Sequence, residues 1–557
     1  MGDTGPETQS LPSRIATIVH SHFDGLPKRS KPVIRDDGTV EWVPMTGIVL
    51  VKGENTPSET LTCIAVATGA KCLSASRIPH CKGLVLHDCH AEILAMRAFN
   101  FWLMSECHSV LAQEGHSVEH THRHTNDSTS PYIQRRPADI SNANIKRGPE
   151  PPFEIQSDVR IYMYCTCAPC GDASMELCIA AQDDPTPWAI PAPETEPDNT
   201  PSDTNNESTR ATPLLSGRGD FSKLGIVRRK PARADAESTK SKSCSDKIAL
   251  RQVSSLLNYE TSLLVAPTEN AYIAALVLPE EEITRVGCAR CFGEDGRMKG
   301  LKGRVWPIGN GNGAEIETGT GAEAVRGTES RYRYEFRPFQ VLSIPTEQLK
   351  SQWPFRKPRA SDPISEIESD DQSQPDSAAT MKKTKPSNLS SIWVRAPTAP
   401  IPADAEGAPR TVIGDTGSKS LPSLRGSKTG LFENIINGVR QGNKLSAPGL
   451  RGASALSRAK SWSYCKEVLG SIFPSSTESA GPVDGDADGG RVIAGTGPPV
   501  LQTSTYREFK EADLTETIRA RRSAIQSARE VLAGWVPNSG DEAWGLDVLV
   551  DTKKRKR

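Results

Sequence analysis

The sequence predicts an α/β fold in which a mixed β-sheet carries helices on both faces. Runs rich in Val, Ile and aromatic residues recur along the chain, for example at 47–51 and 159–164, and such runs are typical of strands. A strand that leads through a turn into a helix occurs twice, near residues 83–103 and 159–181. Strands alternating with helices in this way favour a sheet that is covered by helices.

Composition predicts one globular body with loose insertions. Hydrophobic residues make up only 36% of the 557 residues, and there are 44 Gly and 42 Pro, so parts of the chain lack the apolar surface that folding requires. We expect a single domain over 1–557. Its ordered core is expected at about 10–107, 157–182, 217–355, 388–396, 428–470 and 501–550. Insertions are expected at about 108–156, 183–216, 356–387, 397–427 and 471–500.

Charge and cysteine content limit the class of protein. The net charge of −1 gives no general attraction to nucleic acid, so RNA binding would depend on local patches. Thirteen cysteines without a secretory signal favour a reducing compartment. The most apolar stretch, 271–278, is too short to span a membrane, and we expect a soluble monomer in the nucleus, the cytoplasm or both. The basic tail 553–557 is a nuclear signal, a nucleic-acid patch or a solvated end.

The expected elements follow one another in a simple order. Ser13 caps an opening amphipathic helix, and residues 47–51 and 62–66 form a hairpin. A strand at 83–86 leads into a buried helix that runs from His90 to about Leu103. Later helices are expected at 171–181, 245–257, 457–469 and 506–532, and later strands at 159–164, 332–336 and 340–344. Two further segments, 390–394 and 430–438, lie between and after the expected linkers. Residues 271–278 fit a strand or a helix.

Three residues at predicted helix starts predict a catalytic metal site. A catalytic zinc needs about three protein ligands and one open position for water, and His90, Cys170 and Cys244 supply that number. Glu92 lies two residues after His90, where a carboxylate can act on a metal-activated water without binding the metal.

A competing arrangement uses the same cysteine. The common deaminase pattern has a second Cys three positions after the first, but Ala173 stands there. Two C-x-x-C pairs, Cys167 with Cys170 and Cys288 with Cys291, would instead form a structural zinc site. That alternative leaves the His90–Glu92 pair unexplained.

The triplets H-A-E at 90–92 and P-C-G at 169–171, with S-C-S-D-K at 243–247, resemble those of the adenosine deaminases acting on RNA and their tRNA-specific relatives. The resemblance implies a cytidine-deaminase-like core elaborated by C-terminal helices. It implies Zn²⁺ bound by His90, Cys170 and Cys244. It also implies that Glu92 shuttles the proton while adenosine is hydrolysed to inosine.

The same resemblance implies a buried inositol hexakisphosphate, which would compensate buried cations. The loop R-R-K-P-A-R-A-D at 228–235 resembles the family's R-T-K-P-G-R-x-D, although on charge alone it is a solvated basic loop. Asp88 and Lys230 would link zinc and phosphate, and Asp235 would lie near the flipped nucleotide. The matching phosphate-binding candidates are Arg97, Lys247, Lys460, Tyr506, Lys510 and Trp535.

The resemblance favours tRNA as the substrate. The stretch before His90 already carries predicted strands of the catalytic domain, so it leaves no room for the double-stranded-RNA-binding domains of duplex editases. The tRNA-specific relatives imply adenosine 37, beside the anticodon of tRNA-Ala. The alternatives are a duplex-RNA adenosine deaminase, a cytidine deaminase, and an RNA-binding scaffold with a structural zinc.

Overall fold

The computed structural model describes a defined part of the chain. The described residues are 9–34, 40–118, 130–136, 150–181, 215–216, 223–230, 237–307, 332–357, 384–398, 424–426, 429–473, 499–512 and 514–550. Most of the expected insertions between 183 and 500, together with the basic tail 553–557, lie outside these residues.

A nine-stranded sheet forms the centre of the fold, and it is mixed as predicted. Parallel pairing joins β14 to β11 and β11 to β8, while the other pairs are antiparallel. The strand order is β14 (Gln340–Ile344), β11 (Ile273–Pro279), β8 (Val159–Cys165), β2 (Met45–Lys52), β3 (Thr60–Thr68), β16 (Leu389–Val394), β18 (Leu431–Ile436) and β17 (Arg425–Gly426), with β19 (Val439–Arg440) also paired to β18. The ambiguous residues 271–278 are therefore mainly strand.

The predicted hairpin is the middle of this sheet. Strand β2 pairs with β3 from Met45 opposite Thr68 to Lys52 opposite Thr60, and its other edge pairs with β8. Gly53 and Asn55 in the turn adopt positive φ angles of 64° and 62°, which these two residue types tolerate best.

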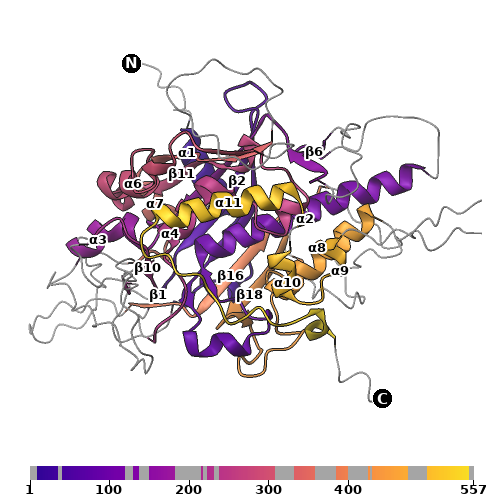
Figure 1. Ribbon diagram of the computed structural model, residues 1–557. Helices are drawn as coiled ribbons and strands as arrows, with labels where there is room; N and C mark the ends of the chain where they lie inside the picture. The colour runs from indigo at the N-terminus through magenta and orange to yellow at the C-terminus, as the bar shows by residue number, and fades with distance from the viewer. Residues whose placement is uncertain are drawn as a thin grey trace, which may run out of the picture.

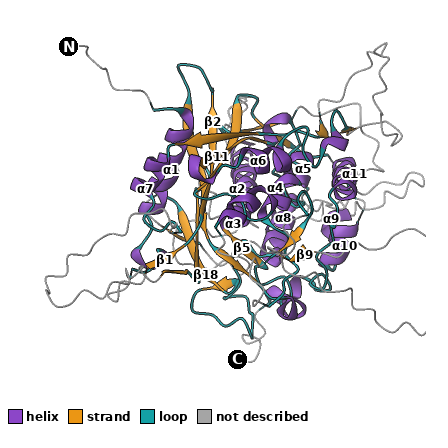
Figure 2. Cartoon of the chain, turned by 90° about the vertical axis from the view of Figure 1, so that its left-hand side faces the viewer, coloured by secondary structure: helices purple, strands orange, loops and turns teal. Residues whose placement is uncertain are grey.

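One face of the sheet is covered by α1 (Leu11–Asp24) and α7 (Thr346–Gln352), on the left in Figure 2. Ile15, Val19 and Phe23 of α1 are buried there. The helix starts three residues earlier than predicted, because the side chain of Ser10 accepts the backbone N–H of Ser13. Ser13 therefore lies inside the helix and does not cap it.

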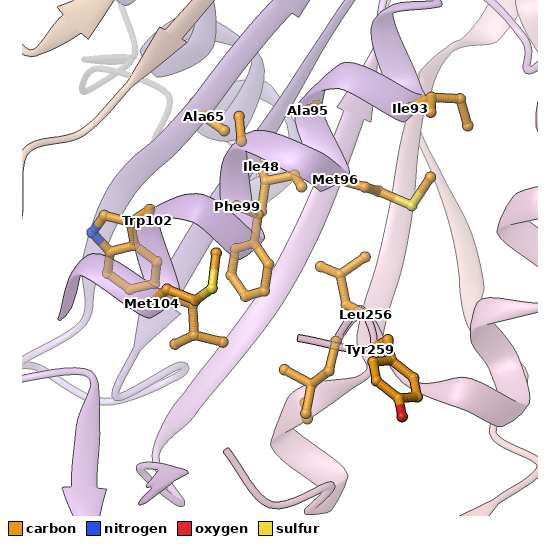
Figure 3. Packing of buried hydrophobic residues seen from close by; sticks show 14 of the residues in the cluster. Ile48, Ala65, Ile93, Ala95, Met96, Phe99, Trp102, Met104, Leu256 and Tyr259 are labelled. Atoms are coloured by element: carbon orange, nitrogen blue, oxygen red, sulfur yellow. The ribbon is translucent and has the colours of Figure 1, made fainter. Parts of the chain in front are cut away.

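The other face carries α2 (Ala91–Val118), with the C-terminal helices α8 (Arg458–Ile472), α10 (Tyr506–Glu511) and α11 (Glu516–Val531) on the same side (Figures 1 and 2). Phe99, Trp102 and Met104 of α2 are buried within one large core cluster that includes Ile48 of β2 and Leu256 (Figure 3). Among the described residues, no helix has the length and apolar character needed to cross a membrane.

The prediction that 108–156 is a disordered insertion is wrong at both of its ends. Helix α2 continues to Val118, because Val110 is still buried in the core. Strands β6 (Ile133–Arg135) and β7 (Phe153–Ile155) then pair with each other. The polar composition of the whole stretch hid these elements, although Ile133, Phe153 and Ile155 are buried in the core.

Three other predicted elements differ from the structure. Residues 83–86 form no strand, because Lys82 and Gly83 take positive φ angles of 49° and 67°. The strand there is the later β5 (Asp88–His90), which pairs with β4 (Ala70–Cys72). The expected last helix is two helices, since Thr515 caps α11 anew after α10 ends.

The expected helix at 245–257 is also two short helices, α4 (Cys244–Ala249) and α5 (Arg251–Ser254). Strand β13 (Arg333–Glu335) was expected in the main sheet, but it pairs only with β12 (Val305–Pro307). The remaining elements are β1 (Val40–Trp42) with β15 (Thr384–Pro386), β9 (Leu215–Ser216) with β10 (Arg228–Arg229), and helices α3 (Met175–Ala180), α6 (Arg285–Phe292) and α9 (Pro499–Gln502).

Candidate active site

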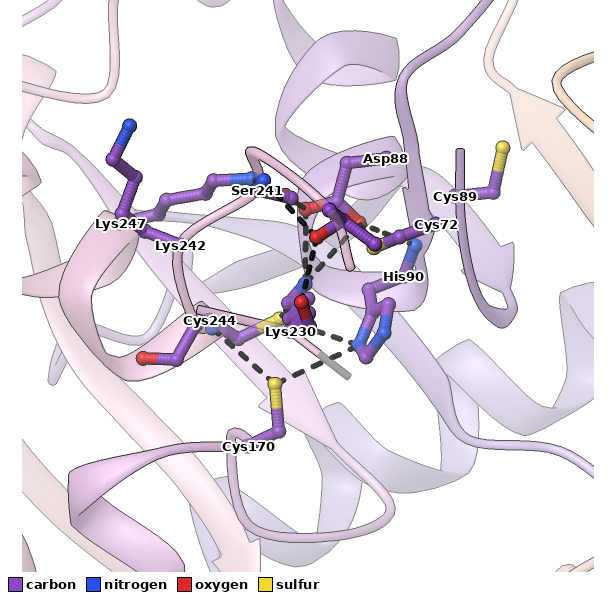
Figure 4. A network of polar contacts seen from close by, with 12 residues as sticks. Cys72, Asp88, Cys89, His90, Cys170, Lys230, Ser241, Lys242, Cys244 and Lys247 are labelled. Carbon is purple, nitrogen blue, oxygen red and sulfur yellow. Dashed lines mark hydrogen bonds and ion pairs between the residues drawn. The ribbon is translucent and has the colours of Figure 1, made fainter. Parts of the chain in front are cut away.

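Three side chains that are far apart in sequence meet where β5 ends. His90 is the last residue of β5, Cys170 precedes the turn that leads into α3, and Cys244 is the first residue of α4. His90 Nδ1 lies 3.7 Å from Cys170 Sγ and 3.6 Å from Cys244 Sγ. In Figure 4 the imidazole faces both sulfur atoms.

This donor set fits a zinc ion. Ligand lengths of about 2.0 Å to nitrogen and about 2.3 Å to sulfur in a tetrahedral site place the N and S atoms about 3.6 Å apart. The three side-chain atoms lie within 4.8 Å of one another. Three protein ligands would leave one coordination position open for water, as in catalytic zinc sites.

The two cysteine segments are locked together by Ser243 and Ser245. The N–H of Cys244 points at Cys170 Sγ at 3.4 Å, and Ser245 Oγ bonds to Pro169 O at 3.0 Å and Ala173 N at 3.2 Å. Gly171 has a φ of +107°, and a Cβ placed there would overlap Ser243. Steric overlap with Ser243 therefore explains why the last residue of the P-C-G triplet is glycine.

Asp88 is the centre of the polar network beside these ligands (Figure 4). Its carboxylate accepts the N–H of His90 at 3.0 Å and the hydroxyl of Ser241 at 2.6 Å. Lys230 Nζ lies 2.9 Å from Asp88 Oδ2 and 3.2 Å from Cys244 Sγ, and Lys247 also pairs with Asp88. Burial would raise the pKa of Asp88, but the two lysines hold it well below its usual range.

Glu92 lies in the first turn of α2 and is 3% exposed. Its Oε2 atom has no hydrogen-bond partner among the described residues, and a buried polar atom without a partner calls for an explanation. A substrate or water proton at the open side of the site would supply the missing partner.

Other possible metal-ligand groups in the described part of the chain fit less well. Cys72 and Asp88 share His90 with the site above, and Asp88 is already neutralised by lysines. In the group of Cys81, His87 and Asp541, the carboxylate of Asp541 faces His87 at 2.9 Å and Arg458 at 3.6 Å.

The expected alternative of a structural zinc is not supported by the geometry. No group of close ligand atoms in the described residues joins Cys167 and Cys170 to Cys288 and Cys291. Cys291 instead donates its S–H to Asp172 Oδ2 at 3.2 Å.

A second polar region consists of buried cations. Arg97 donates to Leu456 O at 3.1 Å, Tyr506 donates to Glu260 at 3.3 Å, and Lys510 Nζ lies 3.7 Å from the centre of the Tyr259 ring. Burial lowers the pKa of Lys510 to about 7. These three predicted phosphate-binding residues thus lie around the one carboxylate of Glu260.

Arginines that the sequence analysis did not select complete this region. Arg251 and Arg521 both donate to Leu257 O, at 3.1 and 3.2 Å, and burial with neighbouring Arg521 and Arg97 lowers the pKa of Arg251 to about 9. The sequence does indicate that Arg521 is buried, because it lies three residues from both Ile518 and Ala524 on the apolar face of α11. We call Arg97, Arg251, Lys510 and Arg521 the cation cluster.

The other predicted phosphate ligands lie elsewhere. Lys247 faces Asp88, and Lys460 donates to Ala453 O at 2.5 Å beside Glu433. Trp535 lies under Lys242 and Arg529, at 5.7 and 5.9 Å. Asp235 lies outside the described residues.

Comparison with known proteins identifies the segment that carries this site. Residues 65–295 match the model of the adenosine-deaminase (editase) domain. This segment is therefore similar to the adenosine-deaminase (editase) domain. His90, Glu92, Cys170 and Cys244 all lie within the editase match, whereas Lys510 and Arg521 of the cation cluster lie beyond it.

Similar proteins include some that are named for tRNA and some that are named for double-stranded RNA. The tRNA-specific adenosine deaminase 1 of Schizosaccharomyces pombe is 36% identical over 289 residues, which cover 52% of this chain and 62% of the relative. The protein of the same name from Saccharomyces cerevisiae is 29% identical over 258 residues, or 46% and 56%. The double-stranded RNA-specific editase B2 of Mus musculus is 30% identical over 129 residues, or 23% and 14%.

The chain thus spans less than two thirds of the length of each of these relatives.

Proposed function

We propose that this protein is a zinc-dependent deaminase that hydrolyses adenosine to inosine in tRNA, with adenosine 37 of tRNA-Ala as the target. The observation that carries the proposal is the geometry of His90, Cys170 and Cys244 beside Glu92, whose Oε2 atom has no partner among the described residues. Two relatives whose names specify tRNA, each similar over about half of the chain, support tRNA over duplex RNA.

The residues present can divide the reaction between them. Zinc, when bound, would supply the Lewis acidity that lowers the pKa of a water molecule. Glu92 takes a proton from the attacking water and delivers it to the purine, so that oxygen adds at carbon 6 and the amino group leaves as ammonia. Asp88, Lys230 and the N–H of Cys244 hold the ligands in place and stabilise the charge of the sulfur atoms.

Inositol hexakisphosphate is proposed as a second cofactor, held by the cation cluster. The carboxylate of Glu260 interacts with Arg97, Arg251 and Lys510, and Arg521 adds its charge beside Arg251 and Lys510, so the described basic groups of this cluster outnumber the acidic groups that face them. Burying unpaired charges is costly unless a counter-ion compensates them. A polyanion of high charge density would provide that compensation and would bring α2, α5, α10 and α11 together.

The experiment is incubation of the full-length protein with transcripts of tRNA-Ala and of other tRNAs, followed by inosine detection through sequencing. Glu92→Gln is expected to keep its zinc and to lose at least about 100-fold in turnover, because general acid–base catalysis contributes that much or more. Glu114→Gln, the same change at a partly exposed position of α2 that pairs with Arg135, is the matched control and should leave turnover unchanged.

The results separate the alternatives. Inosine in duplex RNA but in no tRNA would contradict the substrate and leave the chemistry intact. Conversion of cytidine instead of adenosine would contradict the chemistry. Full turnover in Glu92→Gln would show that Glu92 does not move the proton.

A further inference from the structure

Each of the three metal-site residues is followed two positions later by a buried acid. Glu92 follows His90, Asp172 follows Cys170 and Asp246 follows Cys244. Asp172 and Asp246 are both fully buried, at 0% exposure, and Glu92 is 3% exposed. Only the two aspartates are paired with arginine, so the three acids differ in their partners and not in their placement.

Arg290 of α6 holds the first cysteine segment. Its Nε lies 2.9 Å from Asp172 Oδ2, and its Nη2 donates to the backbone carbonyl of Asp172 at 2.8 Å. The same guanidinium reaches Glu176 through Nη1 at 2.7 Å. The remaining oxygen of Asp172 accepts the N–H of Gly225 at 2.9 Å. The turn after Cys170 is therefore fixed through both its side chain and its backbone.

Arg297 holds the second cysteine segment in the same way. Its Nη1 lies 2.6 Å from Asp246 Oδ1, and its Nη2 donates to the carbonyl of Ser245 at 3.1 Å. Asp246 Oδ2 accepts the hydroxyl of Ser243 at 2.6 Å and the N–H of Arg228 at 3.0 Å. Every polar atom of this carboxylate is thus occupied.

The two arginines are joined to each other. The N–H of Arg297 donates to the carbonyl of Arg290 at 2.8 Å, across the turn that follows α6. The segment from Arg290 to Arg297 therefore binds both cysteine loops, and its own backbone hydrogen bond fixes the distance between the two arginines.

We propose that Arg290 and Arg297 are positioning residues that set the separation of Cys170 and Cys244 and so determine the affinity for the metal. By occupying Asp172 and Asp246, they also leave Glu92 as the acid that is available to the substrate. We call the pairs Asp172–Arg290 and Asp246–Arg297 the aspartate–arginine clamp. This inference rests on the proposed zinc site.

The clamp makes a prediction that a purely structural ion pair does not make. Breaking a buried pair by removing one partner destabilises a protein strongly, whereas replacing both partners by neutral groups restores much of the stability. The double variant Asp246→Asn/Arg297→Gln should therefore fold like the wild type. It should still lose the bidentate grip on Ser245 O and Asp246, and groups that orient metal ligands contribute about 10–100-fold to metal affinity.

The experiment uses the full chain with zinc removed and then returned. Zinc affinity is measured by competition with a chromophoric chelator, and cobalt substitution reports ligand geometry through its visible spectrum. We expect zinc affinity about 10–100-fold weaker in the double variant, with an altered cobalt spectrum. Arg297→Lys keeps the positive charge but not the two donor groups of the guanidinium, so its zinc affinity should lie between those of the wild type and the double variant. Arg337→Gln removes a partly exposed ion pair with Glu335 and is the matched control.

Wild-type zinc affinity and an unchanged cobalt spectrum in a folded double variant would overturn the clamp. A wild-type protein that binds zinc but deaminates no RNA would contradict the proposed function, and the metal measurements would still decide on the clamp. A wild-type protein that binds no zinc would overturn both.

Discussion

Gly171→Ala tests whether the backbone between the two cysteine segments is as constrained as the structure indicates. Gly171 has φ +107° and ψ −144°, a region that is essentially restricted to glycine and costs other residues about 1–3 kcal/mol. The new Cβ would also overlap Ser243, which cannot move freely because it caps α4 and bonds to Asp246. Overpacking of this kind costs about 1–3 kcal/mol more.

The expected loss in the free energy of unfolding is therefore about 2–6 kcal/mol. Most globular proteins have only about 5–15 kcal/mol in total, so the change should be easily measured by urea denaturation with chelator present. Zinc content should fall as well, because relief of the overlap would move Cys244 away from Cys170.

Two reference variants separate the contributions. Gly449→Ala is the matched control, because its Cβ would meet no atom within 4 Å, and we expect a change within about 0.5 kcal/mol. Adding Ser243→Gly to Gly171→Ala should recover the overpacking part but not the backbone strain. If Gly171→Ala unfolds like the wild type and keeps its zinc, the steric reasoning is refuted.

Two further predictions concern the buried polar groups behind the site. Asn100→Ala removes four hydrogen bonds of the Asn100 side chain, which join it to Met96, Leu256, Asn258 and Thr261. We expect the free energy of unfolding, measured by urea denaturation, to fall by about 2–4 kcal/mol because buried groups are left unpaired. A change below about 1 kcal/mol would contradict this expectation. For the cation cluster, burial lowers the pKa of Lys510 to about 7, so the free protein holds this lysine neutral above that pH, and a bound polyanion raises its pKa again. Inositol hexasulfate, whose charge does not titrate, should therefore bind with proton uptake at pH 8, and its affinity should fall from pH 7 to 9. Calorimetry in two buffers of different ionisation enthalpy measures the proton uptake, which Lys510→Met should reduce. Equal proton uptake by the wild type and the variant would exclude Lys510 as the group that takes up the proton.

The three candidate metal ligands could be selected from the sequence because their signals are local. His90, Cys170 and Cys244 each occur in a short motif at a turn before a predicted helix. Functional residues are common on turns that a rigid core holds in place. Each motif can be recognised by itself, however many residues separate it from the other two. The structure brings the three side chains together as the motifs predict.

The cation cluster could be found only in part, because its members carry no local motif. Arg251 and Arg521 meet at the carbonyl of Leu257 only after α5 and α11 have packed together. Lys460 has a matching position in sequence but turns toward Glu433. Likewise, Asp172 and Asp246 had no visible partner until the segment after α6 placed Arg290 and Arg297 against them.

The central strand β2 has a consequence for how this protein can be divided. The editase match begins at residue 65, inside β3, and so excludes β2, which pairs with both β3 and β8. The core that surrounds α2 extends from Ile48 to Leu549 and includes Trp462 and Phe509 of the C-terminal helices. A fragment cut at the limits of the match would lose β2, β14 and β16, and so would leave edges of β3, β8 and β11 unpaired. Exposed edges of that kind promote aggregation. The candidate metal ligands and Glu92 therefore lie in less than half of the chain, whereas the core that supports them is built from nearly all of the described part.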